Sequence, residues 1–340
     1  MWKKIIFVIL LIISGVLGFF VAKAQITFMG TLDNINRDTD GRLKEVDLSG
    51  IEVNSDQEIV NILVVGNDYR KDRNYSAAGL TDTMIIATMD LKHNTLKTTS
   101  LMRDSYVEIP GYGHAKLNAA NSYGGIRLLY KTIAQNYNIK LDGYVEVGFH
   151  AFVEAVDAVG GVKVTVTESE ANYLNSTNYI RKKKYRNVKV GEQTLNGQQA
   201  LGYCRIRKAG TTVNGLRDDY GRTWRQRTVI NAVFDKLKTL PMSEWIKLAN
   251  KVLKNVTTDL TNEEILSYMK SVLMMGTTKI HQLQLPISGY YTNSGSDLVM
   301  TDGITSEFNP VENAKALNKF IFEYDGKGNF VYGTFENKEN

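Results

Sequence analysis

Arginine side chains gather in the stretch Tyr203–Arg227, and their spacing indicates a binding site for anions. Arg205 and Arg207 lie two residues apart in a segment whose pattern predicts a β-strand, so the pleat would place both guanidinium groups on one face. A planar guanidinium group can bind two phosphate oxygens at once, which a lysine ammonium cannot. This arrangement favours a phosphate or pyrophosphate ligand, with a solvated basic face as the alternative.

The second half of the same stretch predicts an amphipathic helix over 222–237, because its apolar residues recur at offsets of three and four. Arg222, Arg225 and Gln226 fall on one face of the first turn, beside the positive end of the helix dipole. We therefore expect these three side chains to bind the same anion as the two arginines of the predicted strand. Arg227 is expected to point away from that face.

Two aspartates at predicted strand ends could hold a metal ion beside this anion. Asp68 follows the apolar run 58–66, and Asp82 lies at the start of the run 80–90. Loops at strand ends often carry functional side chains, and carboxylates beside a bound pyrophosphate suit Mg²⁺ or Mn²⁺. Ordinary turn and capping roles are the alternative for each aspartate. The 4 histidines show no metal-ligand spacing, which argues against zinc.

Short apolar runs alternate with segments of helical period, which predicts an α/β (α+β layered) fold: one domain with a central mixed β-sheet flanked by helices. Gly124 and Gly125 interrupt one of the expected helices. No boundary is visible after Pro241, so the segment 241–324 is read as the continuation of a single domain, 58–324. The expected strands are 58–66, 80–90, 95–102, 144–149, 162–166 and 280–285, and the expected helices are 119–137, 151–159, 222–237, 263–275 and 312–324.

The N-terminus has the pattern of a membrane anchor. An uncharged apolar run, Ile5–Ala22, follows Lys3 and Lys4 and is long enough as a helix to span a bilayer. The positive-inside rule then leaves residues 1–4 in the cytoplasm and the remaining chain outside the cell membrane. A cleavable signal peptide and a buried helix are the alternatives. Protease added to spheroplasts should digest the external domain, and the mature protein should keep residues 1–22; a resistant domain would reverse the orientation.

Between anchor and domain lies a polar segment, 23–57, which is read as a stalk, and residues 325–340 are expected as a C-terminal tail. The single cysteine excludes an internal disulfide, so the fold must rest on its hydrophobic core. A net charge of +5 is too small to indicate a nucleic-acid partner. The basic run 181–186 is predicted to form a surface loop, which is either simply solvated or in contact with anionic lipid or wall polymer.

Six motifs and their order point to one family. They are NILVVGNDYR, LTDTMIIATMD, MRDSYVEIPGYGHAKLNAANSYGG, DAVGGVKVTV, LNGQQALGYCRIR and DDYGRTWRQR. Together they resemble the LytR–CpsA–Psr family of cell-wall glycopolymer transferases over about residues 58–240. The short cytoplasmic lead, the single anchor and the external domain are also similar to that family.

The resemblance implies a membrane-anchored enzyme that takes a glycopolymer, such as teichoic acid or capsule, from a polyprenyl pyrophosphate carrier and attaches it to peptidoglycan through a phosphodiester. It implies that Asp68 and Asp82 bind magnesium. Asp104 would lie beside the pyrophosphate, as a base or as a group that orients an arginine. The side chains that match the family's pyrophosphate clamp are Arg103, Arg205, Arg207, Arg222 and Gln226, with Lys116 as a further candidate.

Two other functions would use the same site. One is a pyrophosphatase that releases polyprenyl phosphate with water as the acceptor, and the other is a non-enzymatic scaffold that binds the lipid carrier. A transcriptional regulator is not indicated, because the basic site would lie outside the membrane and no helix-turn-helix pattern is visible.

Overall fold

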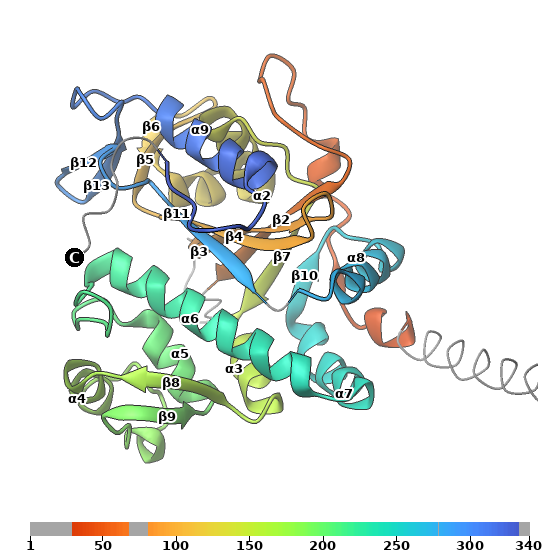
Figure 1. Ribbon diagram of the computed structural model, residues 1–340, viewed down its shortest axis with the longest axis vertical. Coiled ribbons are helices and arrows are strands. Elements are labelled where there is room, and N and C mark those ends of the chain that lie inside the picture. Colours follow the sequence, from red (N-terminus) through yellow and green to blue (C-terminus); the bar gives the residue numbers. More distant parts are fainter. Residues whose placement is uncertain (1–28, 68–80, 278, 333–340) are drawn as a thin grey trace, which may run out of the picture.

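The computed structural model describes residues 29–67, 81–277 and 279–332 (Figure 1). Within these ranges, no helix is both long enough and apolar enough to cross a membrane. The predicted anchor Ile5–Ala22 and the predicted metal ligand Asp68 lie outside the described residues.

A seven-stranded mixed sheet forms the centre of the molecule, as predicted, in the order β1-β10-β7-β2-β3-β4-β11. Strands β7, β2, β4 and β11 run in the same direction, and β3 runs antiparallel between β2 and β4. The C-terminal ends of four strands and the start of β3 therefore meet at one edge, called here the site edge. The strands are β1 (Asn36–Arg37), β2 (Ile59–Asn67), β3 (Thr81–Asp90), β4 (Thr95–Leu101), β7 (Gly143–Gly148), β10 (Val256–Thr258) and β11 (Ile280–Leu285).

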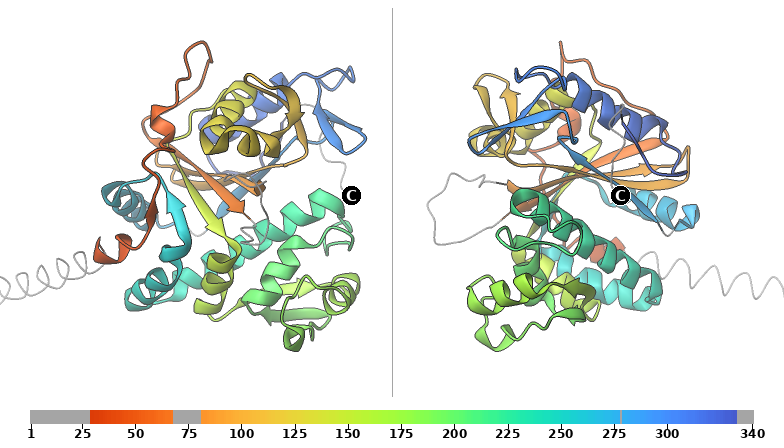
Figure 2. Two further views of the ribbon diagram at one scale, coloured as in Figure 1. Left: turned by 180° about the vertical axis from the view of Figure 1, so that it is seen from behind. Right: turned by 60° about the vertical axis from the view of Figure 1, so that its left-hand side comes forward.

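Helices cover both faces of this sheet, as Figures 1 and 2 show. On one face α2 (Leu117–Tyr137) and α9 (Val311–Asn318) close the main hydrophobic core, which includes Leu63 and Val65 of β2. On the other side lie α3 (Phe149–Ala158), α5 (Gly197–Arg205) and α6 (Asp218–Thr239), with a second core of their own. The remaining elements are β5 (Ser105–Ile109), β6 (Gly113–Lys116), β8 (Val162–Val166), β9 (Gly191–Leu195), β12 (Tyr291–Ser294), β13 (Asp297–Met300), α4 (Glu168–Ser176), α7 (Met242–Val252) and α8 (Asn262–Met275).

The segments predicted as a stalk and as a C-terminal tail pack against the domain over their described residues. Leu32, Ile35 and Leu43 are buried, and β1 pairs in parallel with β10 at the edge of the sheet. The prediction of a stalk is therefore wrong over 29–57, because its scattered apolar residues lack a sustained period and yet pack on the domain. At the other end, the ring of Phe330 packs against Phe320 and Tyr324, so the tail is also attached over its described part.

The predicted strand around Arg205 and Arg207 is also wrong. Residues Gly197–Arg205 form the helix α5, which begins with a capping box between Asn196 and Gln199. Arg205 is its last residue and Arg207 lies in the loop that follows, so the two arginines do not share a strand face. The capping box satisfies backbone donors at the first turn and favours a helix over the strand that the alternation suggested.

Candidate functional site

The site edge of the sheet brings together charged side chains from distant parts of the chain. Asp82 is the second residue of β3, and Arg103 and Asp104 follow β4. Lys116 ends β6, and the loop after α5 carries Arg207. The start of α6 carries Asp219 and Arg222. These seven side chains are named the arginine–carboxylate cluster: Asp82, Arg103, Asp104, Lys116, Arg207, Asp219 and Arg222.

Arg103 lies at the centre of this cluster. Its Nη1 donates a hydrogen bond to Oδ1 of Asp82 at 2.6 Å. Its Nε lies 3.5 Å from Oδ2 of Asp104 and 3.6 Å from Oδ1 of Asp219. Lys116 donates through Nζ to Oδ1 of Asp104 at 2.9 Å. One arginine thus connects three carboxylates that come from three separate segments.

Asp219 organises the other arginines, and the sequence reasoning did not single it out. It accepts a hydrogen bond from Nη2 of Arg222 at 2.8 Å and lies 3.6 Å from Nε of Arg207. Its side chain is only 7% exposed. Its position three residues before Arg222, in the first helical turn, is the signal that could have revealed it.

Burial divides the cluster into an inner and an outer part. The side chains of Arg222 and Asp219 are 5% and 7% exposed, whereas those of Arg207 and Asp82 are 40% and 39% exposed. Burial raises the pKa of Asp219, and the charges of Arg222 and Arg103 offset this only in part. The outer side chains are therefore the members of the cluster that a ligand can reach from solvent.

Asp104 stays ionised in this environment. Burial acts to raise its pKa, but the hydrogen bond from Lys116 and the charge of Arg103 outweigh burial and hold the pKa below its usual value. Among the described residues, the Nε atoms of Arg103, Arg207 and Arg222 have no hydrogen-bond partner. The Nε atoms of Arg103 and Arg207 each lie 3.6 Å from Oδ1 of Asp219, an atom that also lacks a hydrogen-bond partner in the described part of the chain, so these donors form long ion pairs within the cluster.

Gln226 lies next to the cluster, one helical turn after Arg222. Its Nε2 donates to Oγ1 of Thr83 at 2.9 Å, beside Asp82 in β3. Arg227, which is expected to point away from Arg222 and Gln226, contacts β4 and β11 rather than the cluster. Its Nη1 donates to Ser100 and Gln284 at 3.2 and 3.0 Å, and its burial lowers its pKa to about 10.

Arg225 is not part of the ligand site, contrary to the prediction. Its side chain is fully buried, and its Nε donates to Oε1 of Glu170 at 2.7 Å. The two Nη atoms donate to the backbone oxygens of Ile206 and Ala209 at 3.0 and 2.6 Å. These two carbonyls flank Arg207, so Arg225 holds the loop that presents Arg207.

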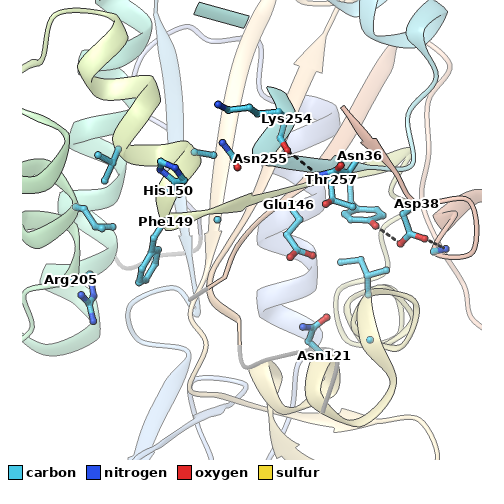
Figure 3. Close-up of a pocket in the computed structure, with 18 of the residues that line it drawn as sticks. Asn36, Asp38, Asn121, Glu146, Phe149, His150, Arg205, Lys254, Asn255 and Thr257 are labelled. Carbon is cyan, nitrogen blue, oxygen red and sulfur yellow. Dashed lines mark hydrogen bonds between the residues drawn. The ribbon is translucent and has the colours of Figure 1, made fainter. Parts of the chain in front are cut away.

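Arg205 lies apart from the cluster and lines a cavity of about 1400 Å³. Its guanidinium carbon lies 5.1 Å from the ring centre of Phe149 and 5.2 Å from that of Tyr179. Figure 3 shows Arg205, Phe149 and His150 on one side of this cavity, with Asn121 and Asp38 across from them. The expectation that Arg205 and Arg207 grip one phosphate from the same strand is not met.

The predicted metal site has one described member, Asp82. Among the described residues, no group of three side chains suited to a metal ion lies together. The carboxylate of Asp82 is partly exposed and faces the cluster, which fits a cation shared between protein and phosphate oxygens rather than one held by protein alone.

The chain is an α/β protein in which arginines and carboxylates converge at one edge of a mixed sheet. The LytR_cpsA_psr family profile matches residues 22–311, and the chain belongs to this family, which confirms the resemblance found in the sequence.

Individual relatives agree with this family. The protein named polyisoprenyl-teichoic acid–peptidoglycan teichoic acid transferase TagU of Bacillus mycoides is 30% identical over 304 residues, or 87% of this chain and 91% of the relative. The structure of TagT bound to LI-WTA has a TM-score of 0.59 at 27% identity and covers 83% of this chain and 95% of its own. TagT with bound octaprenyl pyrophosphate lipid has a TM-score of 0.56 at 25% identity, with the same coverage.

Proposed function

We propose that this protein transfers a glycopolymer from a polyprenyl pyrophosphate carrier to peptidoglycan and forms a phosphodiester. The observation that carries the proposal is the arginine–carboxylate cluster at the site edge, in a chain of this family. The names of TagU and of the TagT complexes support the substrate class. We also propose that Ile5–Ala22 anchors the protein in the cell membrane, with the domain outside.

The cluster can supply most of what phosphoryl transfer requires, which is positioning and charge stabilisation. An acceptor hydroxyl oxygen bonds to the phosphorus that carries the polymer, and the bond from this phosphorus to the bridging oxygen breaks. Polyprenyl phosphate leaves and takes up the proton of the hydroxyl group. Arg207 and Arg103 would neutralise the charge that develops on the leaving phosphate. Asp104, held by Lys116 and the arginines, would orient them rather than take up the proton.

The lipid tail has an apolar surface available on the α6 side of the sheet. Ile62 and Val64 of β2 alternate with core residues and so face α6, and both are only half-buried. On α6, Ile230 and Phe234 follow Gln226 at intervals of four residues and thus continue the face that touches Thr83. We propose that the polyprenyl chain lies between these two surfaces, next to the cluster.

Charge balance supports a divalent cation at Asp82. Together with Asp297, which lies 3.6 Å from Lys116, the cluster has four cations and four carboxylates and is formally neutral. A pyrophosphate diester carries two negative charges, so a neutral site would attract it weakly. When bound, Mg²⁺ would neutralise phosphate charge and polarise the phosphoryl oxygen. We propose that Asp82 and Asp68 hold it.

A single assay separates transfer from the two other functions. Full-length protein in detergent is supplied with a lipid-linked oligosaccharide and peptidoglycan oligomers, and the products are identified by mass spectrometry. We expect oligosaccharide joined to peptidoglycan by a phosphodiester. Release of polyprenyl phosphate without a joined product would indicate a pyrophosphatase, and binding without turnover would indicate a scaffold.

Replacing Asp82 by asparagine should abolish the stimulation of transfer by Mg²⁺ and weaken Mg²⁺ binding, measured by calorimetry with a polyprenyl pyrophosphate present. The melting temperature should stay close to that of the wild type, because asparagine keeps a side-chain oxygen that can accept the hydrogen bond from Arg103. Asp218→Asn is the matched control, since Asp218 is an exposed aspartate at the start of α6. Transfer that is unaffected by EDTA in the wild type would reject the metal assignment.

A further inference from the structure

We propose that Gln284 of β11 is a positioning residue for the phosphate site, because it fixes the rotation of α6 and thereby the arginines of the cluster. This inference rests on the proposed function and adds to it a residue that acts through other side chains. Gln284 lies 57 residues after Arg227, where the last of the six sequence motifs ends. It connects the two segments that carry Arg103 and Arg222.

Both ends of the Gln284 amide make contacts. Its Oε1 accepts a hydrogen bond from Nη1 of Arg227 at 3.0 Å and another from Oγ1 of Thr223 at 2.9 Å, both in α6. Its Nε2 lies 3.2 Å from Sδ of Met102, the buried residue directly before Arg103. Because Arg227 can only donate, the amide oxygen must face α6 and the nitrogen must face the sulfur. The side chain therefore joins α6 to the segment that follows β4.

Arg227 is the main partner of Gln284. Burial lowers the pKa of Arg227 to about 10, and no described carboxylate offsets this effect. The guanidinium group is still charged at neutral pH and needs acceptors, which Gln284 and Ser100 supply at 3.0 and 3.2 Å. The hydroxyl of Thr223, by contrast, also lies within 3.1 Å of two backbone oxygens of its own helix. The contact between Arg227 and Gln284 thus holds α6 against β11.

Two rows of side chains leave the first turns of α6. Arg222 and Gln226 form one row, toward Asp219 and β3, and each is followed directly by a residue that contacts Gln284. Successive helix residues are about 100° apart, so the direction of one row fixes that of the other. Polar and charged residues make up most of the stretch 218–227, so apolar packing alone does not hold this rotation. The contacts of Gln284 therefore help to set where the first row points.

A rotation of α6 would reach the exposed arginines through Asp219. Oδ2 of this carboxylate accepts a hydrogen bond from Arg222 at 2.8 Å. Its Oδ1 lies 3.6 Å from Nε of both Arg103 and Arg207, which belong to other segments. A turn of the helix would move Asp219 relative to these two arginines, and a misplacement of about 1 Å can lower a rate roughly a hundredfold. Gln284 thus acts on the site without contacting the phosphate.

Gln284→Leu tests the proposal, because it removes both polar ends of the amide. In the full-length protein it should lower kcat/KM for the lipid-linked donor about tenfold or more, and calorimetry should show about tenfold weaker binding of a polyprenyl pyrophosphate. Gln282→Leu is the matched control, since Gln282 is exposed and lies two residues earlier on the same face of β11. It should leave both quantities within about twofold of the wild type.

Gln284→Glu should retain transfer and binding within about threefold of the wild type. A carboxylate keeps an oxygen for Arg227 and Thr223 and gives Arg227 a partner of opposite charge, although it loses the weak contact with Met102. If Gln284→Glu lost as much as Gln284→Leu, the contact with α6 would not be the cause of the loss, and the inference would be rejected.

The double variant Gln284→Leu, Arg227→Leu separates positioning from stability. Gln284→Leu leaves the buried Arg227 with one acceptor fewer, so the midpoint of urea unfolding should fall, and removing the cation as well should restore part of it. Transfer and lipid binding should nevertheless stay low, because α6 is still detached from β11. Recovery of transfer and binding together with stability would show a purely structural role and overturn the inference.

The binding measurement keeps this test independent of turnover. The wild-type protein could give no joined product while Gln284→Leu still weakened binding of polyprenyl pyrophosphate and Gln284→Glu preserved it. Positioning by Gln284 would then stand, and the proposed transfer would be rejected. Wild-type transfer together with unchanged transfer and binding in Gln284→Leu would instead overturn the inference and leave the proposed function intact.

Discussion

Replacing Arg207 by lysine should lower the rate of transfer roughly tenfold to a hundredfold, although the positive charge is kept. Arg207 is 40% exposed, and its Nη2 lies 3.9 Å from Oδ2 of Asp104, too far for a hydrogen bond. The outer edge of its guanidinium is therefore available to a ligand. Lysine lacks the planar fork that binds two phosphate oxygens at once. The measurement is kcat/KM for the lipid-linked donor in the product assay.

Arg217→Lys is the control for this substitution. Arg217 is exposed, immediately precedes α6 and makes no side-chain cap, so the same chemical change there should leave transfer within about twofold of wild type. Arg227 cannot serve this purpose, because it is hydrogen-bonded to Ser100. Equal losses at Arg207 and Arg217 would indicate a diffuse electrostatic effect, and a fully active Arg207→Lys would reject bidentate binding.

Replacing Arg225 by methionine should reduce the free energy of unfolding by about 3–5 kcal/mol, because Glu170 would remain buried without its partner. Both side chains are fully buried, and two backbone carbonyls would lose their donors as well. Urea unfolding measures the global effect. Alkylation of Cys204 reports the local one: burial raises the pKa of this thiol to about 12, and its Sγ lies 4.0 Å from the backbone oxygen of Arg225. The thiol should react faster in the variant.

The double variant Arg225→Met, Glu170→Leu should recover part of this loss, because it removes both buried charges together. Lys238→Ala, which breaks an exposed ion pair with Asp235 on the same helix, should cost less than about 1 kcal/mol. If the Arg225→Met variant had the same midpoint of urea unfolding as the wild type but lost transfer, Arg225 would act in ligand binding, contrary to its burial in the structure.

The local sequence pattern was sufficient to predict most strands of the central sheet. The apolar runs at 58–66 and 80–90 correspond to β2 and β3, and the glycine pair interrupts α2 where it was expected. These features depend on neighbouring residues alone, through the alternation of side chains and the backbone freedom of glycine. The same reasoning wrongly predicted a strand at α5, because a capping box there outweighs an alternation of only a few residues.

By itself, the sequence determined which residue types gather near the start of α6 and that they suit a phosphate ligand. Only the tertiary structure decided which of them face that ligand. Arg222 and Arg225 lie about 60° apart around the helix, yet one meets Asp219 beside the site edge and the other is buried against Glu170 of α4. The physical reason is that a guanidinium group has several possible partners, and its position follows the carboxylates that distant segments bring to it.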